Sequence, residues 1–152
     1  MRAVIQRVSS ASVTVDGKVT GKIGNGLLVY LGVGGEDTQQ SAERLIQKII
    51  NLRIFNDEAG KMNLSLLEVG GSVLLISQFT LYADIRKGRR PSFTDAAPLE
   101  KGKTIYEFVL KRLAELGVSG QAGVFQAHMD VASVNDGPVT ISIDSNDLPI
   151  AS

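Results

Sequence analysis

Two apolar runs with glycine at or beside their ends constrain the fold of this chain more than any other feature. Residues 26–33 read GLLVYLGV and residues 72–76 read SVLLI. Short continuous apolar runs bounded by turn residues are typical of strands that are covered on both faces. The sequence therefore predicts a central strand at 26–33 and a second buried strand at 72–76.

Further strands are predicted at both ends of the chain. Short β-branched runs occupy residues 2–8, 11–15 and 18–23, and Asp16-Gly17 before the third run is a two-residue hairpin signal. Residues 131–143 read as two strand-like runs joined or interrupted at Asp136-Gly137-Pro138. A short strand is also expected at 52–55, followed by a loop at 56–60.

Two helices are expected among these strands. Residues 38–51 place apolar side chains at helical spacings, with Asp37 or Thr38 as N-cap. Pro98 opens the second helix, which runs to about Leu116 and is closed by Gly117. At 152 residues, a single compact α/β domain spanning 1–152 is expected. The apolar residues of the first helix are Ala42, Leu45, Ile46, Ile49 and Ile50.

Composition excludes several classes of function. The chain has 16 Lys+Arg against 16 Asp+Glu, so it lacks the overall positive charge of an ordinary DNA-binding protein. With no Cys and one His, thiol catalysis and a zinc site are not expected, and no cofactor is indicated. Without a signal peptide or an 18-residue apolar run, we expect a cytoplasmic protein with no membrane contact.

Three local patterns are better explained by structure than by function. Gly102-Lys103-Thr104 resembles the end of a phosphate-binding loop, but it falls at a helix start. Residues 32–35 (GVGG) resemble a dinucleotide fingerprint, but Asp37 replaces its third glycine. His128 lacks a recognisable nucleophile partner and is interpreted as a packed or surface residue.

The long stretch at 82–97 is rich in arginine and poorly periodic. A structureless segment of this length is unusual unless it is functional or covered by a partner. Its basic cluster is either a solvated loop or a patch that contacts nucleic-acid phosphates. The cluster consists of Arg86, Lys87, Arg89 and Arg90.

Two motifs are highly specific in combination. Residues 77–81 read SQFTL at the end of a predicted strand, and residues 135–140 read NDGPVT. Both stand without change as the hallmark motifs of the D-aminoacyl-tRNA deacylases, which this sequence closely resembles over essentially its whole length. The segment before the second motif departs from the family at Gln126, where a glycine is common.

The resemblance implies an enzyme that hydrolyses the ester between a D-amino acid, or glycine, and tRNA, and that spares L-aminoacyl-tRNA. It also implies a barrel-like, mixed β-sheet with two main helices packed on one side. The family forms homodimers whose active sites are completed across the subunit interface. The partners are thus a charged tRNA and a second copy of the chain, with no DNA.

The resemblance also assigns the site residues. The catalytic segment comprises Ser77, Gln78, Phe79 and Thr80. A cis Gly137-Pro138 peptide, supported by Arg7, reaches into the partner's pocket and selects the chirality of the substrate. The residues for substrate binding and chiral selection are Gly137, Pro138, Arg7, Asn135, Ala127 and Met129.

Physical reasoning supports these roles. A cis Gly-Pro unit can turn both carbonyl oxygens to one side, and glycine lets this backbone approach the α-carbon of the substrate. An L side chain would then clash where a D substrate has only hydrogen. Because an aminoacyl ester is already activated, donors in 77–80 that stabilise the oxyanion can suffice without a strong base.

Two alternatives remain open at this stage. A threonine-dependent hydrolase of small D-amino acid esters or amides would use Thr80 as its nucleophile, although no activating base is evident near Thr80. A binding module for tRNA ends would bind without turnover. The resemblance favours Thr80 as a positioning residue and assistance from the 2′-hydroxyl of the tRNA.

Overall fold

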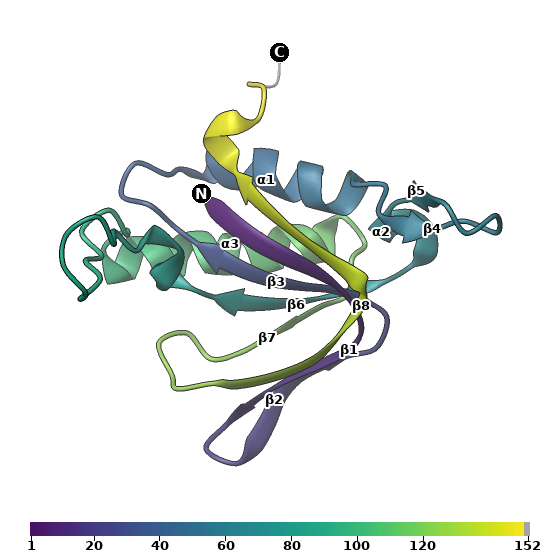
Figure 1. The fold of residues 1–152 in the computed structure, drawn as a ribbon, viewed down its shortest axis with the longest axis horizontal. Coiled ribbons are helices and arrows are strands. Elements are labelled where there is room, and N and C mark those ends of the chain that lie inside the picture. Colours follow the sequence, from purple (N-terminus) through teal and green to yellow (C-terminus); the bar gives the residue numbers. More distant parts are fainter. Residues whose placement is uncertain (151–152) are drawn as a thin grey trace.

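The central layer is a mixed sheet in which the first strand contacts three others. We describe residues 1–150 of a computed structural model (Figure 1). β1 (Arg2–Val15) pairs antiparallel with β2 (Lys18–Ile23), β3 (Gly26–Gly32) and β8 (Asp130–Asp144). β3 also pairs in parallel with β6 (Ser72–Ser77). β6 in turn pairs in parallel with β7 (Gly120–Ala122). The predicted strands at 26–33 and 72–76 therefore lie next to each other in the centre of the sheet.

Both central strands are covered on two faces, as their apolar runs predicted. Leu27 and Val29 of β3 face a core shared with the helices, whereas Leu28 packs into a second cluster on the other face. Removing one such side chain, as in Leu28→Ala, typically costs about 2–5 kcal/mol. The second cluster consists of Val8, Ala11, Val13, Ile23, Leu28, Leu74 and Ile76.

The sheet curves into a nearly closed, barrel-like form around this second cluster. β2 approaches β7 closely at Gly21, where an added Cβ would lie 2.7 Å from the carbonyl oxygen of Ala122. Only a residue without a side chain fits at this approach. The curvature of the sheet is visible in Figure 1. The expected barrel-like α/β fold is confirmed.

Two main helices pack on one side of this sheet. α1 (Gln39–Asn51) is capped by Thr38, whose hydroxyl accepts from the Ser41 N–H at 3.3 Å. α3 (Leu99–Glu115) follows Pro98, and Gly117 after it has φ +81°. Side chains from both helices enter the core that also contains Leu27 and Val29. No helix within residues 1–150 is long and apolar enough to cross a lipid bilayer.

The predicted strand at 52–55 is wrong in most of its length. Leu52 caps the end of α1, since its N–H donates to the Lys48 carbonyl at 3.0 Å. The Ile54 carbonyl accepts from Arg7 rather than from a neighbouring strand. The strand β4 is consequently limited to Phe55–Asn56, which pairs with β5 (Met62–Leu64).

Several short elements were not predicted. α2 (Leu66–Val69) is preceded by its N-cap, Ser65. The Ser65 hydroxyl accepts from the Glu68 N–H, and the Glu68 carboxylate accepts from the Ser65 N–H. The other elements are β5, β7 and the short 3₁₀ helices η1 (Phe79–Tyr82) and η2 (Ser145–Asp147). Segments of two to four residues carry too little periodicity to be recognised from sequence.

The runs at 2–8 and 11–15 form one strand with a bulge. Val8 pairs with Asn135 and Ser10 pairs with Val134, so Ser9 is an extra residue on β1. The extra residue changes which alternate side chains face inward. Val8 and Ala11 therefore enter the same cluster although one position is even and the other is odd.

Candidate functional site

The SQFTL motif lies where β6 ends beside the parallel strand β3. Ser77 is the last residue of β6, and the Gln78 N–H donates to the Leu31 carbonyl at 2.8 Å. The chain then turns into η1, and the Gln78 side-chain amide donates to the Thr80 hydroxyl. Polar residues at the carboxyl end of a parallel strand are a common site position in α/β sheets.

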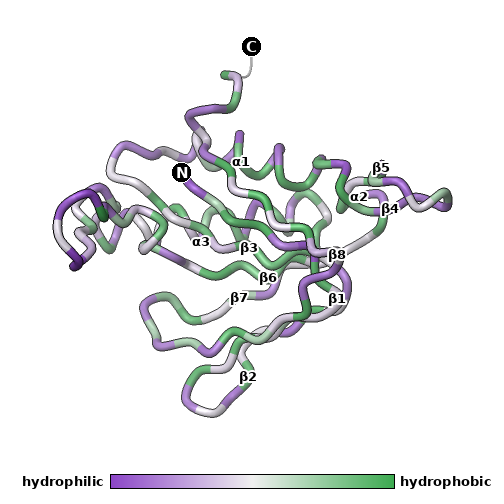
Figure 2. Tube along the Cα trace, viewed as in Figure 1, coloured by the Kyte–Doolittle hydropathy of each residue, from purple (hydrophilic) through white to green (hydrophobic). Residues whose placement is uncertain are grey.

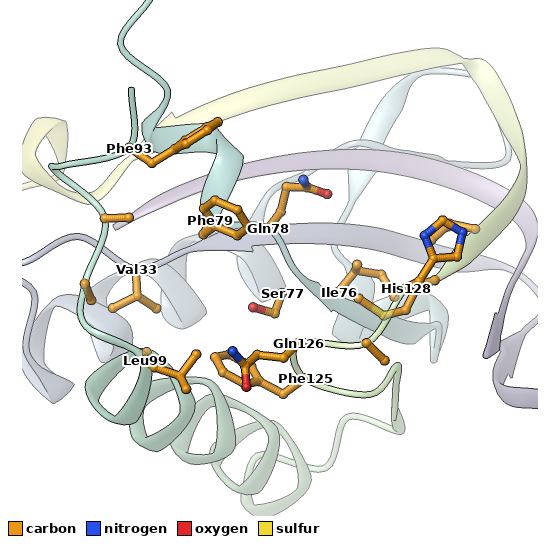
Figure 3. Close-up of a pocket in the computed structure, with 16 residues that line it drawn as sticks. Val33, Ile76, Ser77, Gln78, Phe79, Phe93, Leu99, Phe125, Gln126 and His128 are labelled. Carbon is orange, nitrogen blue, oxygen red and sulfur yellow. The ribbon is translucent and has the colours of Figure 1, made fainter. Parts of the chain in front are cut away.

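A cavity of about 620 Å³ opens beside this motif (Figure 3). Its walls come from the end of β6, the loop before α3, the first turn of α3 and the segment before β8. Phe79 and Phe93 meet edge to face with ring centroids 5.0 Å apart. The residues that line the cavity are Val33, Ile76, Ser77, Gln78, Phe79, Phe93, Ala96, Ala97, Leu99, Gly102, Phe125, Gln126, Ala127, His128, Met129 and Val131.

Hydrogen-bond donors are available at the motif. Within residues 1–150, the backbone N–H groups of Phe79 and Thr80 donate to no protein acceptor. Ser77 adds a hydroxyl on the cavity wall. Unpaired N–H groups of this kind are able to stabilise negative charge on an ester oxygen.

The tyrosines around the motif are held in their neutral form. Tyr82 closes η1 and donates to the buried Asp37 carboxylate at 3.1 Å. Burial and the nearby Asp37 raise the pKa of Tyr82. Tyr106 packs against Phe125 and donates to the Leu75 carbonyl, and burial raises its pKa to about 12. Neither phenol is ionised at neutral pH.

The NDGPVT motif forms a large bulge on β8. Gln6 pairs with Thr140 and Val8 pairs with Asn135, so residues 136–139 all lie opposite Arg7. The Gly137–Pro138 peptide bond is cis, and Gly137 has φ +127°. The two runs at 131–143 are therefore one strand that is interrupted at the motif.

The Arg7 side chain holds this bulge in place through contacts with Asp136. Its side chain is buried, and its guanidinium donates to the Ile54 carbonyl at 2.7 Å and to the Asp136 carbonyl at 3.2 Å. It also forms an ion pair with the Asp136 carboxylate at 3.3 Å. An added Cβ on Gly137 would lie 2.8 Å from the same guanidinium. Arg7 therefore holds together the start of β1, the segment after α1 and the bulge.

Asn135 bridges the two ends of the bulge. Its side-chain amide donates to the Thr140 hydroxyl at 3.1 Å, and its side-chain oxygen accepts from the Val139 N–H at 3.3 Å. Gly137 and Pro138 themselves are exposed. Neither lines the cavity beside Ser77.

The predicted site residues thus fall into two groups. One group lines the cavity and consists of Ser77, Gln78, Phe79, Ala127 and Met129, with Thr80 bound to Gln78. The other group surrounds the β8 bulge and consists of Arg7, Asn135, Gly137 and Pro138.

The basic cluster lies in an exposed loop between η1 and α3. Asp84 and Ser92 pair across the base of this loop, which Figure 2 shows as largely hydrophilic. The Arg86 guanidinium holds the Asp84 carboxylate at 2.7 Å and lowers the pKa of that carboxyl to about 2. Within residues 1–150, the other three members form no ion pair: Lys87, Arg89 and Arg90.

Sequence reasoning missed the opposite wall of the cavity. Phe93, Leu99 and Phe125 line it, yet they are separated along the chain and were not among the predicted site residues. Leu99, at the start of α3, is 51% exposed, although it is a large apolar side chain.

His128 lies at the edge of the cavity and is 3.5 Å from Asp130. No cluster of three metal-ligating side chains occurs within residues 1–150.

Comparison with known proteins identifies relatives over nearly the whole chain. The chain is 60% identical over 145 residues to a D-aminoacyl-tRNA deacylase of Kosmotoga olearia, covering 95% of this chain and 97% of the relative. It is 56% identical over 148 residues to the protein of that name from Thermotoga petrophila, covering 97% and 99%.

Solved structures agree in fold. The structure of a protein named c-Myc DNA Unwinding Element Binding Protein has a TM-score of 0.89 and 42% identity, with 95% of this chain and 98% of that chain covered. A probable eukaryotic D-amino acid tRNA deacylase has a TM-score of 0.77 at 18% identity, with 93% and 97% covered, which indicates a shared fold.

A family model provides the decisive match. The model described as D-Tyr-tRNA(Tyr) deacylase covers residues 4–144, a range that contains both motifs, the cavity and the β8 bulge. Together with the relatives at 56–60% identity, this match shows that the chain belongs to the D-Tyr-tRNA(Tyr) deacylase family.

Proposed function

We propose that this protein hydrolyses the ester bond of D-aminoacyl-tRNA and of glycyl-tRNA. The observation that carries this proposal is a cavity of about 620 Å³ lined by Ser77, Gln78 and Phe79, next to which the backbone N–H groups of Phe79 and Thr80 donate to no acceptor within residues 1–150. This arrangement suits an ester whose carbonyl needs polarisation but whose leaving group is already good.

In the proposed reaction, the ester carbonyl lies against the N–H groups of Phe79 and Thr80. A water molecule adds its oxygen to the carbonyl carbon, and the bond from that carbon to the ribose oxygen then breaks. A proton of the attacking water passes to the ribose oxygen, with the 2′-hydroxyl of the tRNA assisting this transfer, and free amino acid and tRNA are released. Donors of this type typically contribute about 2.7–4 kcal/mol each to transition-state stabilisation.

Thr80 acts in this scheme as a positioning residue. Its hydroxyl already accepts a hydrogen bond from the Gln78 amide, which orients both side chains. Within residues 1–150, no side chain that can act as a base is hydrogen-bonded to the Thr80 hydroxyl, and the phenol of Tyr82, two residues further on, has a raised pKa and is bound to Asp37. A hydroxyl nucleophile normally requires such a base.

The exposed Gly137–Pro138 segment is proposed to select the chirality of the substrate in a homodimer. This segment does not line the cavity of its own chain, so the two motifs act on one substrate if a second copy supplies the bulge. The absence of a side chain at Gly137 lets its backbone approach the α-carbon and exclude an L side chain. Arg7 and Asn135 hold the bulge in place.

The dimer proposal has a direct test. Light scattering after gel filtration should give about twice the 16.2 kDa mass of the chain. A monomer that is fully active at low concentration contradicts the cross-subunit site.

The chain acts as one domain in the cytoplasm, and the exposed basic cluster of Arg86, Lys87, Arg89 and Arg90 contacts tRNA phosphates, with Arg86 contributing least because it already pairs with Asp84. Residues 151–152, at the end of the proposed domain, lie outside the described residues.

Deacylation of matched D-tyrosyl-tRNA and L-tyrosyl-tRNA is the central experiment. We expect rapid hydrolysis of the D substrate and of glycyl-tRNA, with the L substrate left at its uncatalysed rate. Equal hydrolysis of free D-tyrosine esters, with loss of all activity in Thr80→Ala, would instead support a threonine-dependent hydrolase of small esters or amides.

DNA binding is the second candidate, because one solved relative at 42% identity is named for binding a DNA element. The zero net charge of the chain disfavours broad DNA affinity. Competition decides between the two ligands. A single-stranded DNA oligonucleotide that displaces charged tRNA at equal concentration would favour the DNA-binding candidate.

A further inference from the structure

Gln126 has a backbone conformation that rarely accepts a side chain. Its φ is +67°, and it is the third residue of a β-turn in which the Ala127 N–H donates to the Val124 carbonyl at 3.1 Å. This turn position requires a positive φ and strongly favours glycine. Strain of this kind persists mainly where a site gains from it, which directs attention to the side chain of Gln126.

That side chain lies on the cavity wall. Figure 3 shows the Gln126 amide beside Phe125, on the side of the cavity formed by α3. The neighbouring lining residues on this side, Leu99 and Gly102, have no polar side-chain atoms. Within residues 1–150, the Gln126 amide forms no hydrogen bond. A free donor and a free acceptor therefore stand together on an otherwise apolar wall.

The rest of the cavity suits a flat aromatic ligand. Phe79 and Phe93 form an edge-to-face pair, and the Phe79 side chain is 57% exposed at the opening. Exposed aromatic side chains of this kind stack on unpaired bases of single-stranded nucleic acid. A carboxamide side chain, that of asparagine or glutamine, matches the adjacent donor and acceptor of adenine.

We infer that Gln126 is a specificity-determining residue whose amide binds the N6 and N7 edge of the terminal adenine of tRNA. This inference rests on the proposed function, because it requires the aminoacylated end of a tRNA to enter the cavity. The contact is remote from the ester, so it affects the binding of substrate more than the chemical step. The strained turn is retained because it directs this amide into the cavity.

The test compares two D-tyrosyl-tRNAs that differ at one group. One ends in adenosine, and the other ends in purine riboside, which lacks the 6-amino donor. The wild-type protein should show a kcat/KM about tenfold lower on the second substrate, mainly through KM. In Gln126→Gly, the two substrates should react equally well, at the level of wild type on purine riboside.

The glycine variant separates this role from a general loss of structure. Because glycine adopts a positive φ without strain, Gln126→Gly should have a Tm at least equal to that of wild type. Gln121→Ala is the matched control, since it removes another exposed glutamine amide, which lies on β7 outside the cavity. This control should keep the tenfold preference for adenosine.

Two outcomes overturn the inference. Either wild type fails to distinguish the two tRNAs, or Gln126→Gly retains the full preference; deacylation of the D substrate in either case leaves the proposed function intact. Equilibrium binding of the two uncharged tRNAs provides a readout that needs no catalysis. A preference for adenosine that depends on Gln126 in binding, without any hydrolysis, would support the inference and refute the proposed deacylase activity.

Discussion

The two motif regions are built in opposite ways. Residues 77–80 continue a buried strand and open onto a cavity whose walls come from the same chain. In the second motif, residues 136–139 form a largely exposed bulge on β8, which the buried Arg7 side chain contacts through the Asp136 carbonyl. The first region lines a cavity within one chain, whereas the second presents an exposed surface that does not line this cavity. The conformation of each short motif therefore depends on the part of the fold that supports it, which is the strand β6 for the first motif and Arg7 for the second.

The largest expected effect is on the exposed motif. In Gly137→Ala, the new methyl group would lie 2.8 Å from the Arg7 guanidinium and 2.9 Å from a Val139 methyl, at a φ of +127°. The bulge must shift, and a displacement of about 1 Å at a site can lower the rate about a hundredfold. Single-turnover deacylation of D-tyrosyl-tRNA measures this loss.

Gly24→Ala is the control for this substitution. Gly24 has open space around its Cα and no positive φ, so an added methyl group should leave activity unchanged. A Gly137→Ala variant with the activity of wild type would show that the bulge has no part in the reaction.

The next effect concerns the support of the bulge. Arg7→Leu leaves the buried Ile54 carbonyl without its donor and removes the contacts to Asp136. We expect the free energy of unfolding to fall by about 2–3 kcal/mol, as for other buried hydrogen bonds to charged groups. Urea denaturation provides the measurement.

Asp136→Asn sharpens this prediction. Its side chain is 56% exposed and its backbone carbonyl still accepts from Arg7, so the loss should stay below about 1 kcal/mol. Equal losses in the two variants would mean that the ion pair, rather than the backbone contacts, supports the bulge.

A smaller effect is expected at the cavity. Thr80→Ala removes the acceptor of the Gln78 amide, so both side chains lose their orientation. We expect the rate on D substrate to fall about tenfold, consistent with the loss of one hydrogen bond. Hydrolysis of L-tyrosyl-tRNA should remain absent, because Thr80 lies outside the bulge group. Activity gained on the L substrate would contradict the separation of the two regions.

The smallest effect is expected in the loop that follows the first motif. Neutralising Lys87, Arg89 and Arg90 to Gln should reduce the slope of log affinity for tRNA against log salt by about one for each phosphate contact. Arg86→Gln alone should change the slope less, because Arg86 already forms an ion pair with Asp84 at 2.7 Å. An unchanged slope in the triple variant would identify a solvated loop.

Much of the fold was determined by sequence alone because its signals are local. The run at 26–33 predicted a strand covered on both faces, and β3 is the central strand. The apolar periodicity of 38–51 and the glycine after the second helix predicted α1 and the end of α3 within a few residues. The two motifs identified the family, which the comparisons confirmed.

Tertiary structure decided what depends on residues far apart in the chain. The Ile54 carbonyl accepts a hydrogen bond from Arg7 instead of from a neighbouring strand. Of the strand predicted at 52–55, only Phe55 is in a strand, β4. The cavity wall from Phe93, Leu99 and Phe125 exists because the loop, α3 and the turn before β8 converge on the end of β6. Sequence periodicity reports which face of an element is buried, but not which partner covers it, because packing between distant segments leaves no pattern within either one.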